Sequence, residues 1–219
     1  TTHGLTTVPY ERGYDYARTG GLSIVTQTGM YGPQAVPFHE YSFGINKIID
    51  LGNMCDIDET DCLEFLGRDE NTQVISLYME HTRCAARFLE VARAISAIKP
   101  ILCLKGGRSP DAASALASHT GSLAGDDALY DGLLRQAGIM RVEEYEDLFE
   151  CAKGFLYQPL PQGNRLGIVT LTGAMGIQCI DAARENGLTP GQPTPESVAR
   201  LRDIHPSLGA HPVDLGPPS

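Results

Sequence analysis

Residues 74–79 read Val-Ile-Ser-Leu-Tyr-Met, six consecutive residues without a charged side chain. A strand that is apolar along its length is typical of a sheet that helices cover on both faces. Four other short runs are rich in apolar residues, and we expect each of them to be a strand. They occupy residues 22–26, 45–51, 101–105 and 139–142.

Stretches with the spacing of amphipathic helices separate these runs. We expect helices over residues 31–41, 60–66, 82–98, 126–136 and 145–157. The third of them has one apolar face, made by Cys84, Phe88, Ala92 and Ile95. Gly138 suits the C-cap of the fourth. Five strands that alternate with helices predict an α/β fold with a parallel, doubly wound sheet and right-handed crossovers. Among such sheets we favour the flavodoxin-like order 2-1-3-4-5.

The sequence predicts one domain and part of a second. We expect an irregular lead-in over residues 1–20, a flavodoxin-like domain over residues 21–158, a linker over residues 159–164 and a partial second flavodoxin-like domain over residues 165–219. The partial domain should contain a strand at residues 166–171, a helix at residues 175–186, a helix that starts at Pro195 behind the N-cap Thr194, and a loop over residues 205–219. The first residue is Thr1 and not Met, which suggests a piece of a longer polypeptide.

The composition limits the class of protein. A formal net charge of -10 and a pI near 5.0 argue against nucleic acid or an anionic membrane surface as a partner. No apolar run is long enough to span a bilayer, and no charged-then-apolar leader opens the sequence. The six Cys include no Cys-x-x-Cys pair, which favours reduced, mostly buried thiols in a cytoplasmic protein over a metal site or a disulfide framework.

A run of small residues at positions 106–125 holds the first candidate for chemistry, His119. The run has no aromatic residue and one long side chain, Arg108. Because it can bury little apolar area, we expect a loop that presents a reactive imidazole. The alternative is a polar surface loop with an idle histidine.

The ends of the strands supply the other candidates, because ligands of parallel sheets bind outside the carboxyl ends near the switch point in strand order. The first strand ends in Thr26-Gln27-Thr28-Gly29, which offers two hydroxyls and free backbone N–H groups at a helix N-terminus. That arrangement suits a phosphate, although Thr is also a routine N-cap. The third strand ends in Glu80, a carboxylate that follows an apolar run. The alternative interpretation of Glu80 is a solvated residue in the turn from strand to helix. A carboxylate that accepts from one ring nitrogen of His119 leaves the other free to attack phosphorus. Thr172-Gly173 offers a second candidate phosphate cradle.

These motifs also carry a resemblance to a known family. They are, in order, Thr26-Gln27-Thr28-Gly29, Gly52-Asn53 with Asp56, Leu77-Tyr78-Met79-Glu80, Lys99-Pro100 with Lys105-Gly106-Gly107-Arg108, and Ser118-His119-Thr120-Gly121 with Ala124-Gly125. Together they resemble the NDP-forming acyl-CoA synthetases, relatives of the succinyl-CoA ligase α subunit. The resemblance covers most of the chain from Gly21 onward.

The resemblance implies a function for several residues. By it, His119 is phosphorylated and carries phosphate between an acyl phosphate and a nucleoside diphosphate, and Glu80 orients its ring. The helices after Thr28 and Thr172 hold the phosphate at two stations, with Gly29 and Gly173 in their turns. Thr26, Thr120 and Gly121 are further phosphate-binding residues by the same resemblance.

The resemblance also implies substrates and partners. The complete enzyme is an acid–thiol ligase that uses CoA, Mg-nucleotide and phosphate as substrates, with no tightly bound cofactor and no metal site. A CoA-binding Rossmann domain and an ATP-grasp domain should be fused to this chain or lie on another subunit. No Gly-x-Gly-x-x-Gly unit occurs in this sequence. Because one strand with two helices cannot satisfy its own ladder, we expect the partial domain to hold a homodimer.

Four positions depart from the family pattern. Thr26 and Thr28 stand where the family has Ser, which keeps both hydroxyls. Met175 makes the second cradle poorer in Gly than is usual, and His211 replaces Asn before Pro-Val-Asp.

Two other functions remain open at this stage. A flavodoxin would hold the phosphate of FMN on the same turn and could stack the flavin on Tyr31 and Tyr78. A regulatory domain could keep the synthetase fold without turnover. We interpret the other five histidines as structural or surface residues; they are His3, His39, His81, His205 and His211.

Overall fold

A computed structural model of the chain describes residues 19–29, 44–120 and 126–216, and for residues 117–120 it describes the backbone alone. The expected lead-in over residues 1–18 and the expected helix at residues 31–41 lie outside these ranges. The chain divides into two compact units, Thr1–Pro159 and Leu160–Ser219, which are taken separately below.

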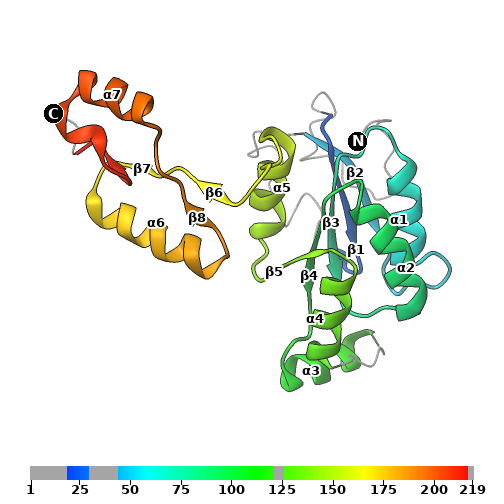
Figure 1. Ribbon diagram of the computed structural model, residues 1–219. Helices are drawn as coiled ribbons and strands as arrows, with labels where there is room; N and C mark the ends of the chain where they lie inside the picture. The colour runs from blue at the N-terminus through cyan, green and yellow to red at the C-terminus, as the bar shows by residue number, and fades with distance from the viewer. Residues whose placement is uncertain (1–18, 30–43, 121–125, 217–219) are drawn as a thin grey trace. The chain divides into compact units, whose positions relative to one another are not determined.

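The first unit is built on one parallel sheet of five strands (Figure 1). The strands are β1 (Leu22–Thr26), β2 (Ile45–Asp50), β3 (Val74–Met79), β4 (Ile101–Lys105) and β5 (Met140–Val142). Their order is β2-β1-β3-β4-β5, which confirms the predicted flavodoxin-like topology. The residues of β3 are buried except for Tyr78, as expected for an apolar strand inside the sheet.

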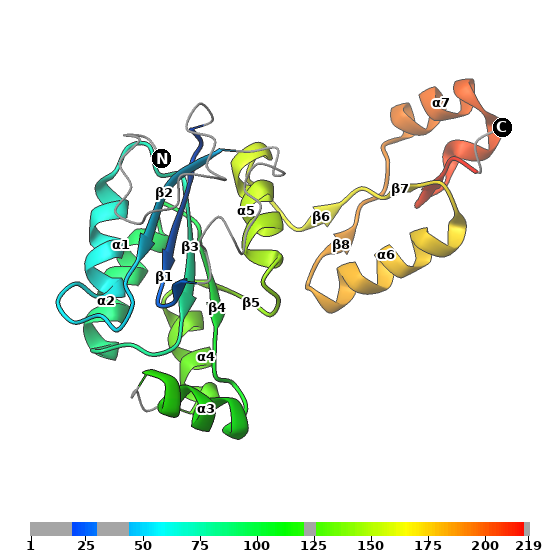
Figure 2. The same ribbon diagram turned by 180° about the vertical axis from the view of Figure 1, so that it is seen from behind.

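Helices cover both faces of this sheet, as the views in Figures 1 and 2 show. One core cluster joins the sheet to α1 (Glu59–Arg68), α2 (Ala85–Ser96) and α4 (Asp127–Gln136). A second cluster on the opposite face joins it to α5 (Asp147–Tyr157). The sheet is therefore doubly wound, as predicted.

Local capping residues explain where these helices begin and end. The side chain of Asp58 accepts hydrogen bonds from two backbone N–H groups of α1, and Asp126 caps α4 by accepting one, from the Ala128 N–H. Gly138 follows α4 with a φ of 70°, the left-handed conformation that favours glycine. The prediction for α2 is wrong at its start. Cys84 is the exposed N-cap of that helix and does not belong to its buried face.

Residues 110–120 of the small-residue run form a helix, α3 (Pro110–Thr120), and not the predicted loop; residues 121–125 lie outside the described part of the chain. Four alanines raise its helix propensity, and Pro110 suits the first helical position. The Ser109 hydroxyl accepts a hydrogen bond from the Ala112 N–H at 3.2 Å and caps the first turn. The described side chains of α3 are exposed or partly exposed. The sequence was correct in offering no core face, but propensity and capping form the helix without one.

The second unit is a small α/β arrangement with more strands than predicted. It contains β6 (Arg165–Leu166), β7 (Val169–Thr170), α6 (Gly173–Glu185), β8 (Thr189–Pro190), α7 (Pro195–Ile204), the 3₁₀ helix η2 (Pro206–Gly209) and β9 (Val213–Asp214). The expected single strand at residues 166–171 is two strands in two parallel pairs, β6–β8 and β7–β9. The pair β6–β8 is two residues long, and the Gly191 N–H donates to the Leu166 carbonyl at 2.8 Å just after Pro190. The predicted loop over residues 205–219 is also wrong in part, because it contains η2 and β9.

The cysteines differ from the prediction in their burial. Cys62 and Cys103 are buried, Cys151 is partly buried, and the other three are exposed. Burial raises the pKa of each of the two buried thiols to about 12. Over the described ranges, no helix has both the length and the apolar character that crossing a bilayer requires. The same residues contain no group of three or more potential metal ligands.

Candidate functional site

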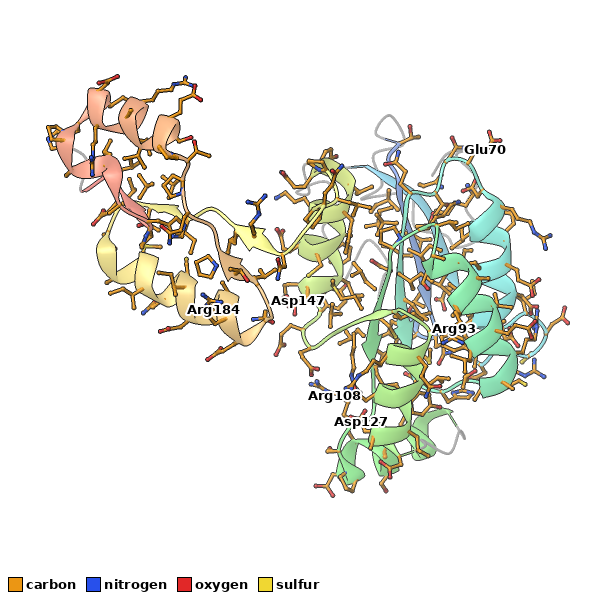
Figure 3. The ribbon with its side chains drawn as sticks, viewed as in Figure 1. Glu70, Arg93, Arg108, Asp127, Asp147 and Arg184 are labelled. Carbon is orange, nitrogen blue, oxygen red and sulfur yellow. The ribbon has the colours of Figure 1, made fainter. Side chains whose placement is uncertain are left out.

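The candidate site lies at the edge of the sheet where β1, β3 and β4 end. These are adjacent strands, so the residues that follow Thr26, Met79 and Lys105 share one edge. Figure 3 labels Arg108 and Asp127 at this edge and Glu70 at the opposite one. The sheet thus brings together the first cradle, Glu80 and the segment that leads into α3, as strand order predicts.

The turn after β1 is closed by its own threonines. The Thr26 hydroxyl is 1% exposed; it donates to the Thr28 carbonyl at 2.7 Å and accepts from the Thr28 N–H at 3.2 Å. The Thr28 N–H is therefore bonded within the turn and is not one of the free N–H groups that the sequence predicted there. The hydroxyl at the first position orders the turn, and Thr28 and Gly29 form its more exposed part.

Glu80 is buried at the end of β3. It is 6% exposed, so it is not the solvated turn residue that the sequence left as an alternative. The Tyr78 hydroxyl lies 3.4 Å from its Oε1. Burial, and then the neighbouring Glu80 charge, raise the pKa of Tyr78 to about 12, so that the phenol remains a hydrogen-bond donor at neutral pH.

Gln27 connects the turn after β1 to the residues after β3. Its Oε1 accepts from the Glu80 N–H at 2.7 Å and from the His81 N–H at 3.1 Å. Its Nε2 donates to the His81 carbonyl at 2.8 Å and lies 3.3 Å from Met54 Sδ. The side chain is 4% exposed. The sequence does not identify Gln27 as a site residue. A single polar residue between two threonines gives no signal of the direction in which its carboxamide points.

Lys105 places a buried cation at the end of β4. It is 1% exposed, its Nζ donates to the Gly106 carbonyl, and the same atom lies 4.5 Å from the centre of the Tyr130 ring. Burial lowers the pKa of this ammonium group, against a weaker opposite effect of the Asp127 carboxylate. Burial, with the Lys105 charge, also lowers the pKa of His81 and so favours a neutral ring there. Sequence reasoning used Lys105 only as part of a motif.

The structure places the backbone of His119 near the C-terminal end of α3, one residue before its last, Thr120. The side chains of both residues and the whole of Gly121 lie outside the described part of the chain. Contact between the side chains of His119 and Glu80 therefore stays a prediction.

The second cradle repeats one hydrogen bond of the first. Thr170 ends β7 and donates its hydroxyl to the Thr172 carbonyl at 2.9 Å, as Thr26 does to Thr28. Thr172 is the N-cap of α6 and accepts from the Met175 N–H at 3.3 Å. Gly173 is the first residue of that helix. The signal was present in the sequence as Ile-Val-Thr-x-Thr-Gly at residues 24–29 and 168–173, and the period was overlooked.

The tyrosines of the flavin alternative and the remaining histidines either have structural roles or lie outside the described residues. Tyr78, which a flavin site would need as a stacking surface, packs instead against the core under α5; Tyr31 lies outside the described residues. His211 accepts from the Ile168 N–H at 3.2 Å and His205 caps η2, so both are structural as predicted. His3 and His39 are not among the described residues.

Comparison with known proteins identifies relatives of this chain. Residues 19–155, more than half of it, match the family described as the succinyl-CoA ligase like flavodoxin domain. The α subunit of an ADP-forming acetate–CoA ligase I from Pyrococcus furiosus is 40% identical over 170 residues, which are 77% of this chain and 37% of that subunit. An ADP-forming acetate–CoA ligase II from Archaeoglobus fulgidus is 36% identical over 205 residues, 91% of this chain and 30% of that protein.

A solved structure agrees with these matches. It is described as the dinucleotide forming acetyl-coenzyme A synthetase 1 of Ca. Korarchaeum cryptofilum in complex with phosphate and ADP. It matches with a TM-score of 0.82 and 34% identity over 91% of this chain and 44% of that one. The chain thus spans less than half the length of each of these relatives. The matched residues cover the whole five-stranded sheet, and the chain belongs to the succinyl-CoA ligase like flavodoxin domain family.

Proposed function

We propose that this chain is the phosphohistidine-carrying portion of an NDP-forming acyl-CoA synthetase. The complete enzyme converts acyl-CoA, NDP and inorganic phosphate into the free acid, NTP and CoA. The observation that carries the proposal is the burial of the Glu80 carboxylate, 6% exposed, at the strand end between the first cradle and the segment leading to His119. A carboxylate at this strand end can accept a hydrogen bond from an imidazole and support that ring when it becomes cationic or phosphorylated.

The chemistry assigned to His119 has two phosphoryl transfers. One ring nitrogen donates to Glu80, which fixes the tautomer and leaves a lone pair on the other nitrogen. That nitrogen attacks the phosphorus of an acyl phosphate; the N–P bond forms as the bond from phosphorus to the acyl oxygen breaks, and the acid leaves as a carboxylate. A terminal oxygen of the Mg-bound nucleoside diphosphate then attacks the same phosphorus, the N–P bond breaks, and NTP leaves with the imidazole restored.

The two cradles serve as the two stations of the phosphoryl group in this proposal. Thr28 and Gly29, ordered by Thr26, hold it at the first station together with Thr120 and Gly121. The turn Thr172-Gly173 at the start of α6 holds it at the second, through unpaired backbone donors and the positive end of the helix dipole. The hydroxyl-to-carbonyl hydrogen bond that both turns make supports this assignment.

The relatives guide the proposal about substrates and partners. Several are named ADP-forming acetate–CoA ligases, one is named a 4-hydroxybutyrate–CoA ligase, and the solved relative binds phosphate and ADP. We therefore assign CoA, phosphate and a Mg-nucleotide as substrates of the complete enzyme, with the CoA-binding and ATP-grasp domains as partners, fused or on another subunit. We also assign a homodimer to the chain, held by residues 165–219. Exposed Val169, Leu171 and Ile177 in that segment support this assignment.

Phosphorylation of the full 219-residue chain tests the proposal. Radioactive acetyl phosphate should label the wild-type chain, and the label should be lost in acid and kept in base, as a phosphoramidate is. His119→Asn should abolish labelling. His205→Asn, which alters an exposed histidine outside the site, is the matched control and should label normally. An unlabelled wild-type chain, or equal labelling of His119→Asn, would overturn the proposal.

A further inference from the structure

The main chain around Glu80 is held by a side chain from another strand. The ladder of β3 ends at Met79, whose carbonyl accepts from the Gly106 N–H at 2.9 Å. Beyond that point, the N–H groups of Glu80 and His81 both donate to Gln27 Oε1. One carboxamide therefore binds both of the N–H groups that follow the end of the ladder.

The second cradle shows that the turn itself does not need this carboxamide. Leu171 stands at the position of Gln27, and its side chain is 53% exposed. The second turn nevertheless makes the same hydroxyl-to-carbonyl bond, from Thr170 to Thr172. The bond from the strand neighbour is also equal in both turns: the Leu51 N–H donates to the Thr26 carbonyl and the Leu215 N–H to the Thr170 carbonyl, each at 2.8 Å.

We propose that Gln27 is the positioning residue for Glu80, and that its carboxamide sets the carboxylate at the depth where it meets the imidazole of His119. This inference rests on the proposed function and deepens it. Gln27 does not touch the phosphoryl group; it acts through Glu80. A displacement of the carboxylate by a fraction of an ångström weakens its hydrogen bond to a ring nitrogen and lowers the fraction of the reactive tautomer.

The test replaces Gln27 with the residue that the second turn already tolerates. Gln27→Leu removes the bonds to Glu80 and His81 and leaves the threonine bonds of the turn. Asn46→Leu is the matched control, because Asn46 is another buried carboxamide, 0% exposed, on β2. It donates to Asp69 at 2.8 Å and to Thr72 at 3.0 Å, away from the candidate site.

Labelling by acetyl phosphate is then measured over a range of concentrations. Gln27→Leu should lower the labelling rate at saturation by about tenfold or more, and should change the half-saturating concentration less than about threefold. Asn46→Leu should keep the wild-type rate at a temperature where it is folded, as circular dichroism verifies. In an Asn46→Leu variant that does not fold, Asn46→Ser takes its place as the control.

A double variant separates positioning from a general structural effect. Because Gln27 acts through Glu80, Gln27→Leu combined with Glu80→Gln should label within about threefold of Glu80→Gln alone. The inference would be overturned if the loss of labelling rate in the double variant equalled the product of the two single losses, or if Gln27→Leu labelled at the wild-type rate. The phosphohistidine proposal would survive either result. A wild-type chain that takes no label overturns the proposed function, and the inference with it.

Discussion

Asp50 and Asp214 occupy equivalent positions in the two units of the chain. Asp50 is the partner of Thr26 across β1 and β2, and Asp214 is the partner of Thr170 across β7 and β9. Each carboxylate accepts a hydrogen bond from the N–H of the glycine two residues later, at 3.0 Å and 2.9 Å. Since both glycines follow Asp-Leu, a strand, a Thr-x-Thr-Gly turn and an Asp-Leu-Gly strand end occur twice in this chain. The two cradles therefore share one structural element, and within their Thr-x-Thr-Gly turns they differ at Gln27 and Leu171.

Glu80→Gln tests the role of the buried carboxylate in the proposed transfer. Gln keeps the shape and one acceptor but removes the charge that supports a cationic or phosphorylated imidazole. We expect labelling of His119 to slow by roughly 10²-fold or more, the scale of a positioned acid–base partner. Intact-mass kinetics with acetyl phosphate measure the rate, and Glu70→Gln, at the opposite edge of the sheet, is the control. A folded Glu80→Gln chain that labels at the wild-type rate would make Glu80 a turn residue only.

Lys105→Met tests whether the buried cation is kept at a cost to stability. Lys105 belongs to none of the ion pairs found among the described residues, and its Nζ has the Gly106 carbonyl and the Tyr130 ring as neighbours. Replacing a buried charge by an apolar group of similar length is often stabilising. We expect Lys105→Met to raise the free energy of unfolding at pH 7 by about 1 kcal/mol or more. A lower free energy of unfolding would contradict this account.

The pH dependence of that difference follows from the lowered pKa of Lys105. Between the lowered pKa of the folded state and the unfolded value near 10.4, the unfolded chain binds the proton more tightly. The stability of the wild-type chain therefore rises through this window relative to Lys105→Met. Urea unfolding at pH 7 and at about pH 10 should show the advantage of the Met variant shrinking. An advantage that grows with pH would mean that the charged form is favoured by folding.

The sheet could be predicted from the sequence because each strand is a short apolar run that can be recognised locally. Val74–Met79 is apolar and buried, and it needs no knowledge of its neighbours to be recognised. The sequence predicts a loop at Pro110–Thr120 because the segment has no apolar face to bury. The segment is a helix because its alanine content and the Ser109 cap favour a helical backbone without burial. Burial alone is a poor criterion for a short exposed helix.

Strand order predicts which residues of the candidate site lie at the same edge of the sheet, but not the contacts between their side chains. The ends of β1, β3 and β4 had to share one edge once the order was correct, which placed Thr26 and Glu80 together. The contacts of Gln27 span 53 and 54 positions in the sequence, and no local pattern encodes them. Burial of Lys105 depends likewise on Tyr130, which a distant helix supplies.

Asp69→Asn tests the polar network around the side chain of Asp69. Asp69 Oδ2 accepts from Lys47 at 2.7 Å, from Thr72 at 2.6 Å and from Asn46 at 2.8 Å. Burial acts to raise the pKa of this carboxyl, but these three donors together hold it well below its ordinary value. We expect Asp69→Asn to lower the free energy of unfolding at pH 7 by about 2 kcal/mol or more, because a charged acceptor with three donors is lost.

The sign of the pH effect follows from a lowered carboxyl pKa. The contribution of Asp69 is complete above the unfolded value of about pH 4 and is lost as the pH falls from there toward the lowered pKa of the folded state. Wild type and Asp69→Asn should therefore converge in urea unfolding as the pH is reduced below about 4. Labelling of His119 at pH 7 should be unaffected, since the network does not contact the candidate site. Divergence at low pH would show that another group controls acid stability.

The proposed homodimer makes the last prediction. In the second unit, Val169 is 63% exposed and Ile177 is 61% exposed, although each belongs to an element that would normally bury such side chains. Two-residue strands and single helices bury little apolar area, so contact with a second copy would stabilise this unit. We expect light scattering to give a dimer for the full chain and a monomer after deletion of residues 165–219. Val169→Asp and Ile177→Asp should each weaken the dimer at least about tenfold, whereas Ile98→Asp, at a residue 70% exposed in the first unit, should not. A monomeric full chain, or a dimer that survives the deletion, would remove residues 165–219 from the interface.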